Sequence, residues 1–575
     1  MKTKARESTE GVLVEGDKYA IAKLEREQHV DAVLQSTSTK KIVVAGPGTG
    51  KTYLFKRMLE GKKPTLTLTF VNSLVEDLSL DLCGISDVKT LHGFALGVIK
   101  AATKKSIKLF PKLGYVIKDD ATILLDEAID FDFLFHNRED DNKHIEFYKK
   151  RKDFYGYYGY ADIVFAAVKH FEKSKDKIPT FQQVVVDEIQ DFNLLEVCLI
   201  DLLAEKSPVL LAGDDDQALY ESLKSASPQH IRQRHNEKSF GYDAFCLPYC
   251  SRCTRVIVEA FNDIITGASR NGYLIGRIGK PFTYFEDEKK DSDCDANPYL
   301  VYAQIFSRQI PWFIQKCIED VANEVRGKFS VLIISPTKTQ SRRIAAALKQ
   351  KGLKNLLFVD RRDSDEPSLF DGLSLLLENP SCNLGWRIVA KELLSDTEFK
   401  AILKTTAEDE ARPVTDLIGN EVKKEVKRML RVLSLLSKDK ELPDEGSFAD
   451  LLVRIDIDAF RMAKDFLKNE IESRTISNSS PAIRKIPITA TTIQSSKGLA
   501  ADYVFITHFD DRYFIKDKDK SKITDQDICN FLVALTRARK RVFLISSDTS
   551  KTPAFLNWIE PERIQHMKAN GKVMP

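Results

Sequence analysis

The chain has 575 residues, of which 43% are hydrophobic and 30% charged, and its 87 basic and 84 acidic residues give a net charge of +3. A single hydrophobic core stops growing at about 250–300 residues, so this length predicts several domains. The composition excludes a wholly disordered chain, and no run approaches the ~20 apolar residues of a membrane span. Because the net charge is close to zero, it neither indicates nor excludes nucleic acid, and any DNA path must be a local feature.

The N-terminus and the cysteines favour a cytoplasmic protein. Residues 1–17 are charged and lack the apolar segment of a secretory signal. The nine cysteines are scattered along the chain, as expected in a reducing compartment. Cys246, Cys250 and Cys253 are close enough in sequence to suggest a metal or iron–sulfur site, but no fourth ligand follows at a matching spacing. Three free thiols are therefore the favoured interpretation.

Short apolar runs alternate with helical segments along the chain. Their hydrophobicity is continuous rather than alternating, which is typical of strands buried on both faces of a parallel sheet. The fold class predicted from this pattern is α/β, with parallel sheets flanked by helices. The runs are residues 42–44, 66–70, 184–186, 209–211, 331–334, 503–506 and 542–545.

Two segments interrupt this pattern and are predicted to be helical insertions. Residues 107–181 are charged and aromatic-rich, and residues 365–480 have helical periodicity without buried strand runs. The charged residues 286–291 separate two apolar regions and indicate a solvated connection.

The clearest motif follows the first apolar run and precedes a helical segment. It has the Walker A pattern, although Ala45 stands at its first position, where the general pattern has glycine. In such a loop the backbone N–H groups face the phosphates of ATP, Lys51 reaches the outer phosphates, and the Thr52 hydroxyl ligates Mg²⁺. The nucleotide-binding candidates are Gly46, Pro47, Gly48, Thr49, Gly50, Lys51 and Thr52.

A second motif, Asp-Glu-Ile-Gln-Asp at residues 187–191, follows the run 184–186. An apolar strand that ends in two acids places Asp187 to hold Mg²⁺ and Glu188 to activate water. Acids at a strand end are often only solvated, so this motif gains its weight from the Walker A loop.

This second motif resembles motif II of superfamily 1 helicases of the UvrD/Rep/PcrA type, and further motifs of that family follow in order over residues 28–539. The resemblance implies two RecA-like lobes with ATP between them. It also implies that Gln28 and Gln190 contact the nucleotide, that Gln217 of motif III senses the γ-phosphate, and that Arg252 of motif IV binds it. Arg537 of motif VI would be an arginine finger from the second lobe.

The same resemblance suggests a path for single-stranded DNA. Residues 68–73 and 90–95 are similar to motifs Ia and Ib, in which aromatic and small polar side chains suit base stacking and phosphate contacts. Residues 492–499 resemble motif V. Phenylalanines at such positions could equally belong to the core. The DNA-binding candidates are Phe70, Asn72, His92, Phe94, Tyr220 and Ser496.

The chain departs from the family pattern in three places. In motif V, Gln494 replaces a histidine and Ala500 replaces a glutamate that meets the nucleotide sugar. Motif III lacks its usual aromatic-Arg-Gly-Ala continuation, since residues 221–225 read Glu-Ser-Leu-Lys-Ser. Motif IV usually reads Asn-Tyr-Arg-Ser, and here Ser251 stands at the tyrosine position directly before Arg252.

These observations lead to a hypothesis with four subdomains and one main function. The first lobe would comprise residues 1–103 and 176–243, with an insertion at 104–175, and the second lobe residues 244–365 and 480–575, with an insertion at 366–479. The expected function is ATP-dependent, Mg²⁺-dependent 3′-to-5′ movement along single-stranded or tailed duplex DNA, with unwinding. The alternative is a DNA-sensing ATPase subunit that controls a partner nuclease. A P-loop kinase is disfavoured, because it would have no use for Arg537 or for the Gln190-Asp191 extension.

Overall fold

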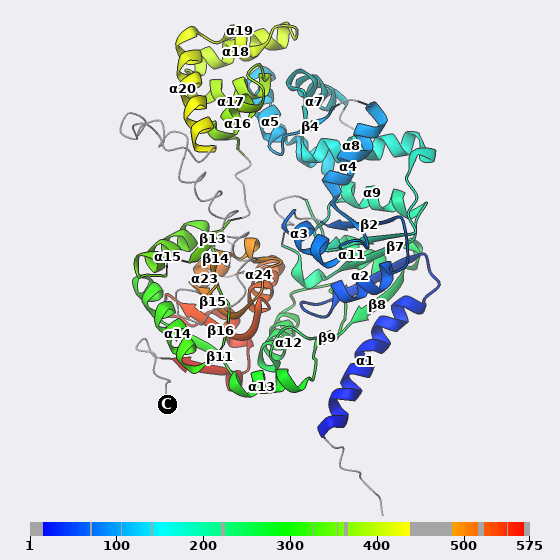
Figure 1. Ribbon diagram of the computed structural model, residues 1–575, viewed down its shortest axis with the longest axis vertical. Coiled ribbons are helices and arrows are strands. Elements are labelled where there is room, and N and C mark those ends of the chain that lie inside the picture. Colours follow the sequence, from blue (N-terminus) through cyan, green and yellow to red (C-terminus); the bar gives the residue numbers. More distant parts are fainter. Residues whose placement is uncertain are drawn as a thin grey trace, which may run out of the picture.

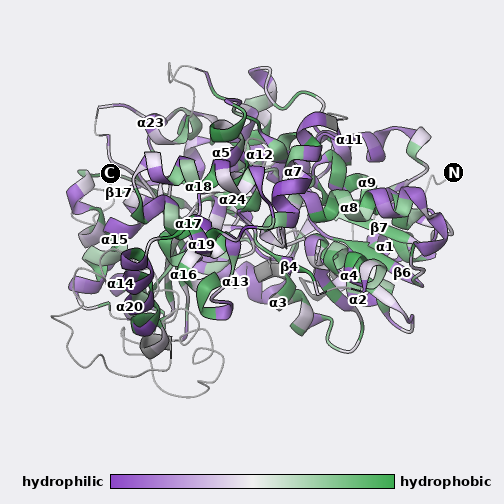
Figure 2. Ribbon diagram, turned by 90° about the horizontal axis from the view of Figure 1, so that it is seen from above, coloured by the Kyte–Doolittle hydropathy of each residue, from purple (hydrophilic) through white to green (hydrophobic). Residues whose placement is uncertain are grey.

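The computed structural model describes residues 15–69, 72–104, 106–139, 142–219, 225–325, 327–353, 355–360, 366–437, 486–515, 522–548 and 550–567. It confirms the predicted α/β class, with two parallel sheets flanked by helices (Figure 1). In Figure 2 the strands β6 and β7 are coloured as hydrophobic, and both are fully buried.

The first sheet has six parallel strands. Their order is β3 (Asp87–Thr90), β2 (Thr65–Thr69), β6 (Gln183–Val186), β7 (Val209–Gly213), β1 (Lys40–Ala45) and β8 (Asp243–Leu247). The helices of this body are α1 (Glu15–Gln35), α2 (Lys51–Leu59), α3 (Asn72–Asp81), α4 (Leu91–Thr103), α9 (Leu194–Ala204) and α11 (Gln229–Asn236).

The second sheet has seven parallel strands. Their order is β13 (Leu356–Val359), β14 (Ile488–Thr492), β12 (Val331–Ser335), β15 (Ala501–Thr507), β16 (Ala538–Ser546), β11 (Leu300–Gln304) and β17 (Ile564–Met567). Its helices are α12 (Arg255–Arg270), α13 (Glu288–Ala296), α14 (Ile310–Glu324), α15 (Lys338–Gln350), α23 (Asp511–Phe514) and α24 (Asp525–Leu535). A short parallel ladder, β9 (Tyr249–Cys250) with β10 (Thr283–Tyr284), lies between the two bodies in sequence.

Two helical segments lie together at the top of Figure 1, although they are inserted into different sheet bodies. The first contains α5 (Leu113–Leu124), α6 (Phe131–His136), α7 (Asn142–Tyr155) and α8 (Tyr160–Lys173), with the short strands β4 (Lys108–Leu109) and β5 (Tyr157–Tyr158). The second contains α16 (Leu369–Glu378), α17 (Asn383–Leu393), α18 (Asp396–Glu408), α19 (Val414–Leu417) and α20 (Asn420–Ser437). The subdomain boundaries remain a prediction.

The two insertions share one hydrophobic core, which also continues into the first sheet body. A buried ion-pair cluster lies in their contact: Asp120 of α5 is fully buried, 2.8 Å from Arg387 Nη2 of α17 and 2.9 Å from Arg151 Nε of α7. Lys112 and Asp371 form a further ion pair of 2.8 Å across the same contact. Apolar packing and buried charge pairs therefore both hold the second insertion against the first.

Short 3-10 helices complete the described elements. Three of them carry residues of the candidate site: η2 (Ile189–Asp191), η3 (Asp215–Gln217) and η8 (Gln494–Ser496). The others are η1 (Lys175–Lys177), η4 (Lys238–Phe240), η5 (Ser307–Gln309), η9 (Ala554–Trp558) and η10 (Pro561–Arg563).

Candidate nucleotide site between the two sheet bodies

The predicted phosphate loop lies between β1 and α2. Gly48 and Gly50 have φ values of +71° and +99°, a region that side chains rarely adopt. A Cβ atom on Gly48 would also lie 2.3 Å from Cβ of Arg252, so only glycine fits there. The other loop residues, Gly46, Pro47 and Thr49, form the same turn, and Lys51 and Thr52 begin α2 at its end. Backbone N–H groups at a helix N-terminus form a favourable environment for phosphate.

The two acids of motif II follow β6 and face this loop. Lys51 Nζ lies 3.0 Å from Glu188 Oε1 and 4.0 Å from Asp187 Oδ1. Burial and the charge of Glu188 raise the pKa of Asp187 to about 7. Although burial opposes ionisation of Glu188, Lys51 and Lys497 hold its pKa well below the usual range. Glu188 is thus an ionised carboxylate beside a cation that could instead bind phosphate.

The phosphate loop and motif II carry oxygen ligands of the kind that Mg²⁺ prefers, a hydroxyl and a carboxylate. The Asp187 carboxylate is buried next to Glu188, and burial, followed by the charge of Glu188, raises its pKa and disfavours its ionised form. A divalent cation would compensate the two negative charges, and carboxylate and hydroxyl oxygens are suitable ligands for it. Asp187 and Thr52, the predicted metal ligands, fit this group.

A continuous chain of hydrogen bonds links motif II to motif III. Gln190 donates to Glu188 Oε2 over 2.5 Å and accepts from the backbone N–H of Asp214 over 3.0 Å. Gln217 donates to Asp214 Oδ2 over 2.7 Å. All four side chains are buried. The two predicted glutamines therefore lie in one network with the candidate general base.

Two arginines from outside the first sheet body reach this network. Arg537, directly after α24, donates to Gln217 Oε1 over 3.1 Å and to the Val533 carbonyl over 2.9 Å. Arg252 lies in the loop between β9 and α12, against the phosphate loop. Burial and the neighbouring charge of Arg252 lower the pKa of Arg537 to about 9. Two neighbouring cations, the buried Arg537 and the half-buried Arg252, favour binding of an anion.

Lys497 and Asp191 belong to the same site but were not among the candidates predicted from the sequence. Lys497 lies after η8 of the second sheet body, donates to Asp191 and to the Gln217 carbonyl, and lies 3.4 Å from Glu188 Oε2. Burial raises the pKa of Asp191 to about 6 even with Lys497 beside it. The Lys-Gly pair of motif V and the last acid of motif II were the signals that could have identified them.

The end of the site where Gln28 is predicted to contact the adenine of ATP is more exposed than the phosphate end. Gln28 lies on α1 and is exposed. Close to it in sequence, Arg26 stacks on the Phe285 ring at 4.9 Å and approaches Gly50 of the phosphate loop. Tyr249, two residues before Ser251, donates to Glu25 over 2.7 Å, and its ring lies 6.5 Å from that of Phe285. Aromatic rings are thus available near the loop although motif IV lacks its usual tyrosine.

The six DNA-binding candidates differ in burial, and some lie outside the described residues. Phe94 is buried against Phe181, which favours a core role, and the buried Ser496 hydroxyl donates to the Ile493 carbonyl. His92 is partly exposed, 3.5 Å from Glu196 and stacked near Tyr160. Phe70 and Tyr220 lie outside the described residues, as does the side chain of Asn72. The roles of all six in DNA binding remain predictions.

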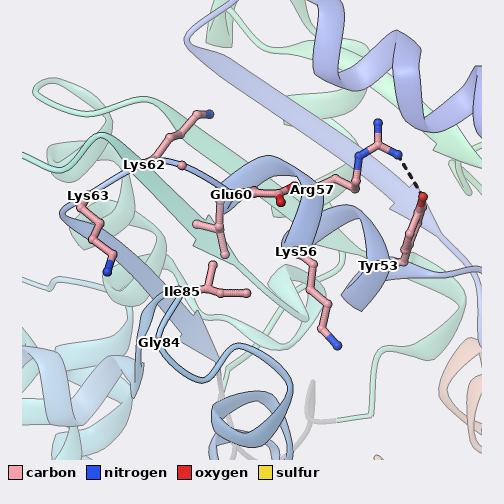
Figure 3. Close-up of a pocket in the computed structure, with 10 residues that line it drawn as sticks. Tyr53, Lys56, Arg57, Glu60, Lys62, Lys63, Gly84 and Ile85 are labelled. Carbon is pink, nitrogen blue, oxygen red and sulfur yellow. Dashed lines mark hydrogen bonds between the residues drawn. The ribbon is translucent and has the colours of Figure 1, made fainter.

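A separate hollow lies at the far end of α2 and does not involve the candidate site. Its volume is about 400 Å³, and Figure 3 shows Lys56, Arg57 and Glu60 along it. Four basic residues line it, including Lys62 and Lys63, and Lys56 is paired with Asp81 at 3.1 Å and Arg57 with carboxylates of α1. We assign no ligand to this hollow.

Two further expectations concern cysteines and membranes. Cys246, Cys250 and Cys253 form no disulfide bond, and their interpretation as free thiols remains a prediction. Within the described part of the chain, no helix has the length and apolarity needed to cross a membrane.

Comparisons with known proteins agree with this architecture. A model described as an AAA domain matches residues 29–223, and one described as the UvrD-like helicase C-terminal domain matches residues 392–549. The DNA helicase II of Haemophilus influenzae is 21% identical over 75% of this chain and 59% of its own length. The ATP-dependent DNA helicase PcrA of Staphylococcus aureus is 23% identical over 68% and 58%, and a probable DNA helicase II homolog of Mycoplasma genitalium is 20% identical over 90% and 85%. The alignments thus span less than two thirds of the Haemophilus and Staphylococcus proteins.

Proposed function

Because this chain belongs to the UvrD/Rep/PcrA-type family of superfamily 1 helicases, we propose that it is an ATP hydrolase that moves along single-stranded DNA and unwinds duplexes. The proposal includes the four subdomains expected from the sequence, with the two sheet bodies as RecA-like lobes. It also includes travel in the 3′-to-5′ direction, Mg²⁺ as the metal, and tailed duplex DNA as a substrate.

One observation carries this proposal: side chains of the second lobe contact the catalytic motifs of the first. Arg537 donates to Gln217, and Lys497 contacts both Asp191 and Glu188. A site completed by both lobes changes its contacts when the γ-phosphate is lost. Nucleotide hydrolysis can therefore be converted into relative movement of the lobes.

The proposal gives each group a chemical role. ATP binding draws Lys51 from Glu188 toward the outer phosphates, which frees the carboxylate to orient and deprotonate the attacking water. Asp187 and Thr52 would hold Mg²⁺, which supplies positive charge at the phosphate oxygens. Arg537 and Arg252 stabilise the charge that develops on the transferred phosphoryl group.

The decisive experiment measures ATP hydrolysis by the purified chain with and without single-stranded DNA. Stimulation by DNA, followed by strand separation on a 3′-tailed duplex, is the expected result. Hydrolysis that single-stranded DNA does not change would overturn the motor proposal.

A second candidate function is a DNA-sensing ATPase subunit that controls a partner nuclease. The altered residues after Tyr220 in motif III favour it, because the family's stacking aromatic residue and the arginine beside it are replaced by Ser222 and Leu223. Efficient unwinding of long tailed duplexes by the chain alone would remove the support for this alternative.

A further inference from the structure

Motif III contains three consecutive buried carboxylates that surround one lysine. Lys280 Nζ lies 2.8 Å from Asp214 Oδ1, 2.7 Å from Asp215 Oδ1 and 2.8 Å from Asp216 Oδ2. The Lys280 side chain is only 3% exposed, and the three aspartate side chains are fully buried. Lys280 donates a hydrogen bond to Asp215 and forms ion pairs with Asp214 and Asp216.

Two arginines complete the charge balance of this cluster. Arg277 Nε lies 2.7 Å from Asp216 Oδ1, and Arg232 Nε of α11 lies 3.0 Å from Asp215 Oδ2. Three cations thus face three carboxylates. The proximity of the aspartates raises the pKa of Lys280 although burial opposes this, so the lysine is charged. The position that a metal ion could take among the acids is filled by the chain's own ammonium group.

Lys280 belongs to a segment that leaves the second lobe and returns to it. We call residues 274–282 the strap. Leu274 and Phe282, at its ends, pack in the core of the second lobe, whereas Ile278, between them, packs in the core of the first. The Leu274 backbone N–H donates to Asp525 at the start of α24 over 2.8 Å. The strap therefore connects α24, which leads to Arg537, with motif III.

The cluster touches the γ-phosphate end of the candidate site through a single carboxylate. Asp214 contacts Lys280 through Oδ1 and accepts from the Gln217 amide through Oδ2, over 2.7 Å. The Oε1 atom of the same Gln217 side chain accepts a hydrogen bond from Arg537. Lys280 is thus linked to the candidate γ-phosphate sensor, Gln217, by one ion pair and one hydrogen bond, both through Asp214.

We propose that Lys280 is a positioning residue for nucleotide recognition. It fixes the Asp214 carboxylate, and Asp214 in turn fixes the Gln217 amide. The orientation of the candidate γ-phosphate sensor therefore depends on the position of the strap and, with it, of the second lobe. This inference rests on the proposed function, because Gln217 must contact the γ-phosphate. It predicts that loss of Lys280 lowers the preference for ATP over ADP, whereas the affinity for ADP itself changes little.

The test measures dissociation constants for ADP and for the non-hydrolysable analogue AMP-PNP. Lys280→Met should lower the preference for AMP-PNP about tenfold or more, the scale of one hydrogen bond to a charged group, and leave the affinity for ADP within about twofold. Gln217→Ala should have the same effect. Because both residues act in one chain of contacts, Lys280→Met in the Gln217→Ala background should cause no further loss. Independent, additive losses would overturn the proposal.

A charge-compensated variant separates positioning from folding. Lys280→Met with Asp216→Asn restores the charge balance of the cluster while leaving Asp214 without its lysine. It should recover the melting temperature but not the preference for AMP-PNP, and recovery of both would show that Lys280 only neutralises charge. Lys280→Arg keeps the charge but changes the donor geometry, and it should fold and lose part of the preference. A wild-type preference in Lys280→Arg and Lys280→Met would overturn the proposal.

A matched control is Lys540→Met, which removes a lysine of the second lobe that pairs with Asp293 at 2.9 Å, away from motif III. It should leave both affinities unchanged. The measurement does not depend on turnover. If the wild-type chain prefers AMP-PNP but shows no DNA-stimulated hydrolysis, the proposed function is overturned, and the role of Lys280 can still be tested by nucleotide binding. If the chain binds neither nucleotide, both proposals are overturned.

Discussion

The substitution Arg537→Ala tests whether the second lobe takes part in the chemistry. Arg537 is 3% exposed, and its guanidinium group contacts Gln217 and the Val533 carbonyl. It is held next to Arg252, with no carboxylate paired to it among the described ion pairs. In this setting the charge of Arg537 is poorly compensated until an anion arrives.

The size of the effect follows from the depressed pKa. Burial and the charge of Arg252 lower the pKa of Arg537 from 12.5 to about 9. At about 1.4 kcal/mol per pKa unit, this difference corresponds to on the order of 5 kcal/mol of unfavourable environment. A phosphoryl group that gains negative charge would relieve it. Arginine fingers contribute roughly 10³–10⁵ in kcat, or about 4–7 kcal/mol, which is the same range.

We therefore expect Arg537→Ala to lower kcat for ATP hydrolysis by about 10³-fold or more at saturating ATP. The melting temperature should not fall, because the substitution also removes a repulsive charge. The assay is steady-state hydrolysis in the presence of single-stranded DNA, with nucleotide affinity measured separately. Arg539→Ala, an exposed arginine two residues along the chain, is the matched control. A loss below about tenfold, or an equal loss in the control, would refute this role.

Four further outcomes are expected. Lys51→Ala should abolish turnover and leave circular dichroism unchanged, and near-normal turnover would contradict the phosphate-loop assignment. Glu188→Gln should bind ATP without hydrolysing it, because an amide cannot take a proton from water; wild-type hydrolysis would exclude it as the base. Arg387→Met should lower the free energy of unfolding in urea by about 3 kcal/mol, since it leaves the buried Asp120 with fewer partners, and a change under about 1 kcal/mol would contradict this. The isolated chain should displace streptavidin from biotinylated single strands well but separate duplexes weakly, since one stacked base is worth about 1–3 kcal/mol and motif III lacks its aromatic residue; equal efficiency in both assays would contradict this.

The parts of the fold that could be predicted from the sequence are those encoded by local patterns. All seven predicted runs lie in strands of the two sheets, apart from Phe70, which lies outside the described residues. Two of the strands that were not predicted have weak local signals, whereas β11 (Leu-Val-Tyr-Ala-Gln) and β13 (Leu-Leu-Phe-Val) are apolar and were missed all the same. β3 is an exposed edge strand with the sequence Asp-Val-Lys-Thr, and β14, although buried, reads Ile-Thr-Ala-Thr-Thr. A threonine-rich central strand forms because its neighbours β12 and β13 cover its edges, which no local pattern records.

The residues of the candidate site likewise fall into those that could be predicted from local sequence and those that could not. Lys51, Asp187 and Glu188 could be predicted because each motif is contiguous in sequence. Lys280 could not, because its three partners lie more than sixty residues away in the chain and only the folded strap brings them together. Phe94 illustrates the opposite difficulty, since an aromatic residue in a DNA-contact motif and one in a core have the same local sequence.

The shared core of the two insertions limits how the lobes can move. The lobes are joined at the candidate nucleotide site and again at the top of Figure 1, where α17 lies against α5 and an Arg387–Asp120 ion pair links the two helices. A body that is fixed at one place by buried charges and packing can move mainly by rotating about that place. If the contacts of Arg537, Lys497 and the strap with the first lobe are all released, we expect the junction of the insertions to become the pivot. A small opening at the nucleotide then produces a larger displacement of the parts of the second lobe that lie farthest from that junction.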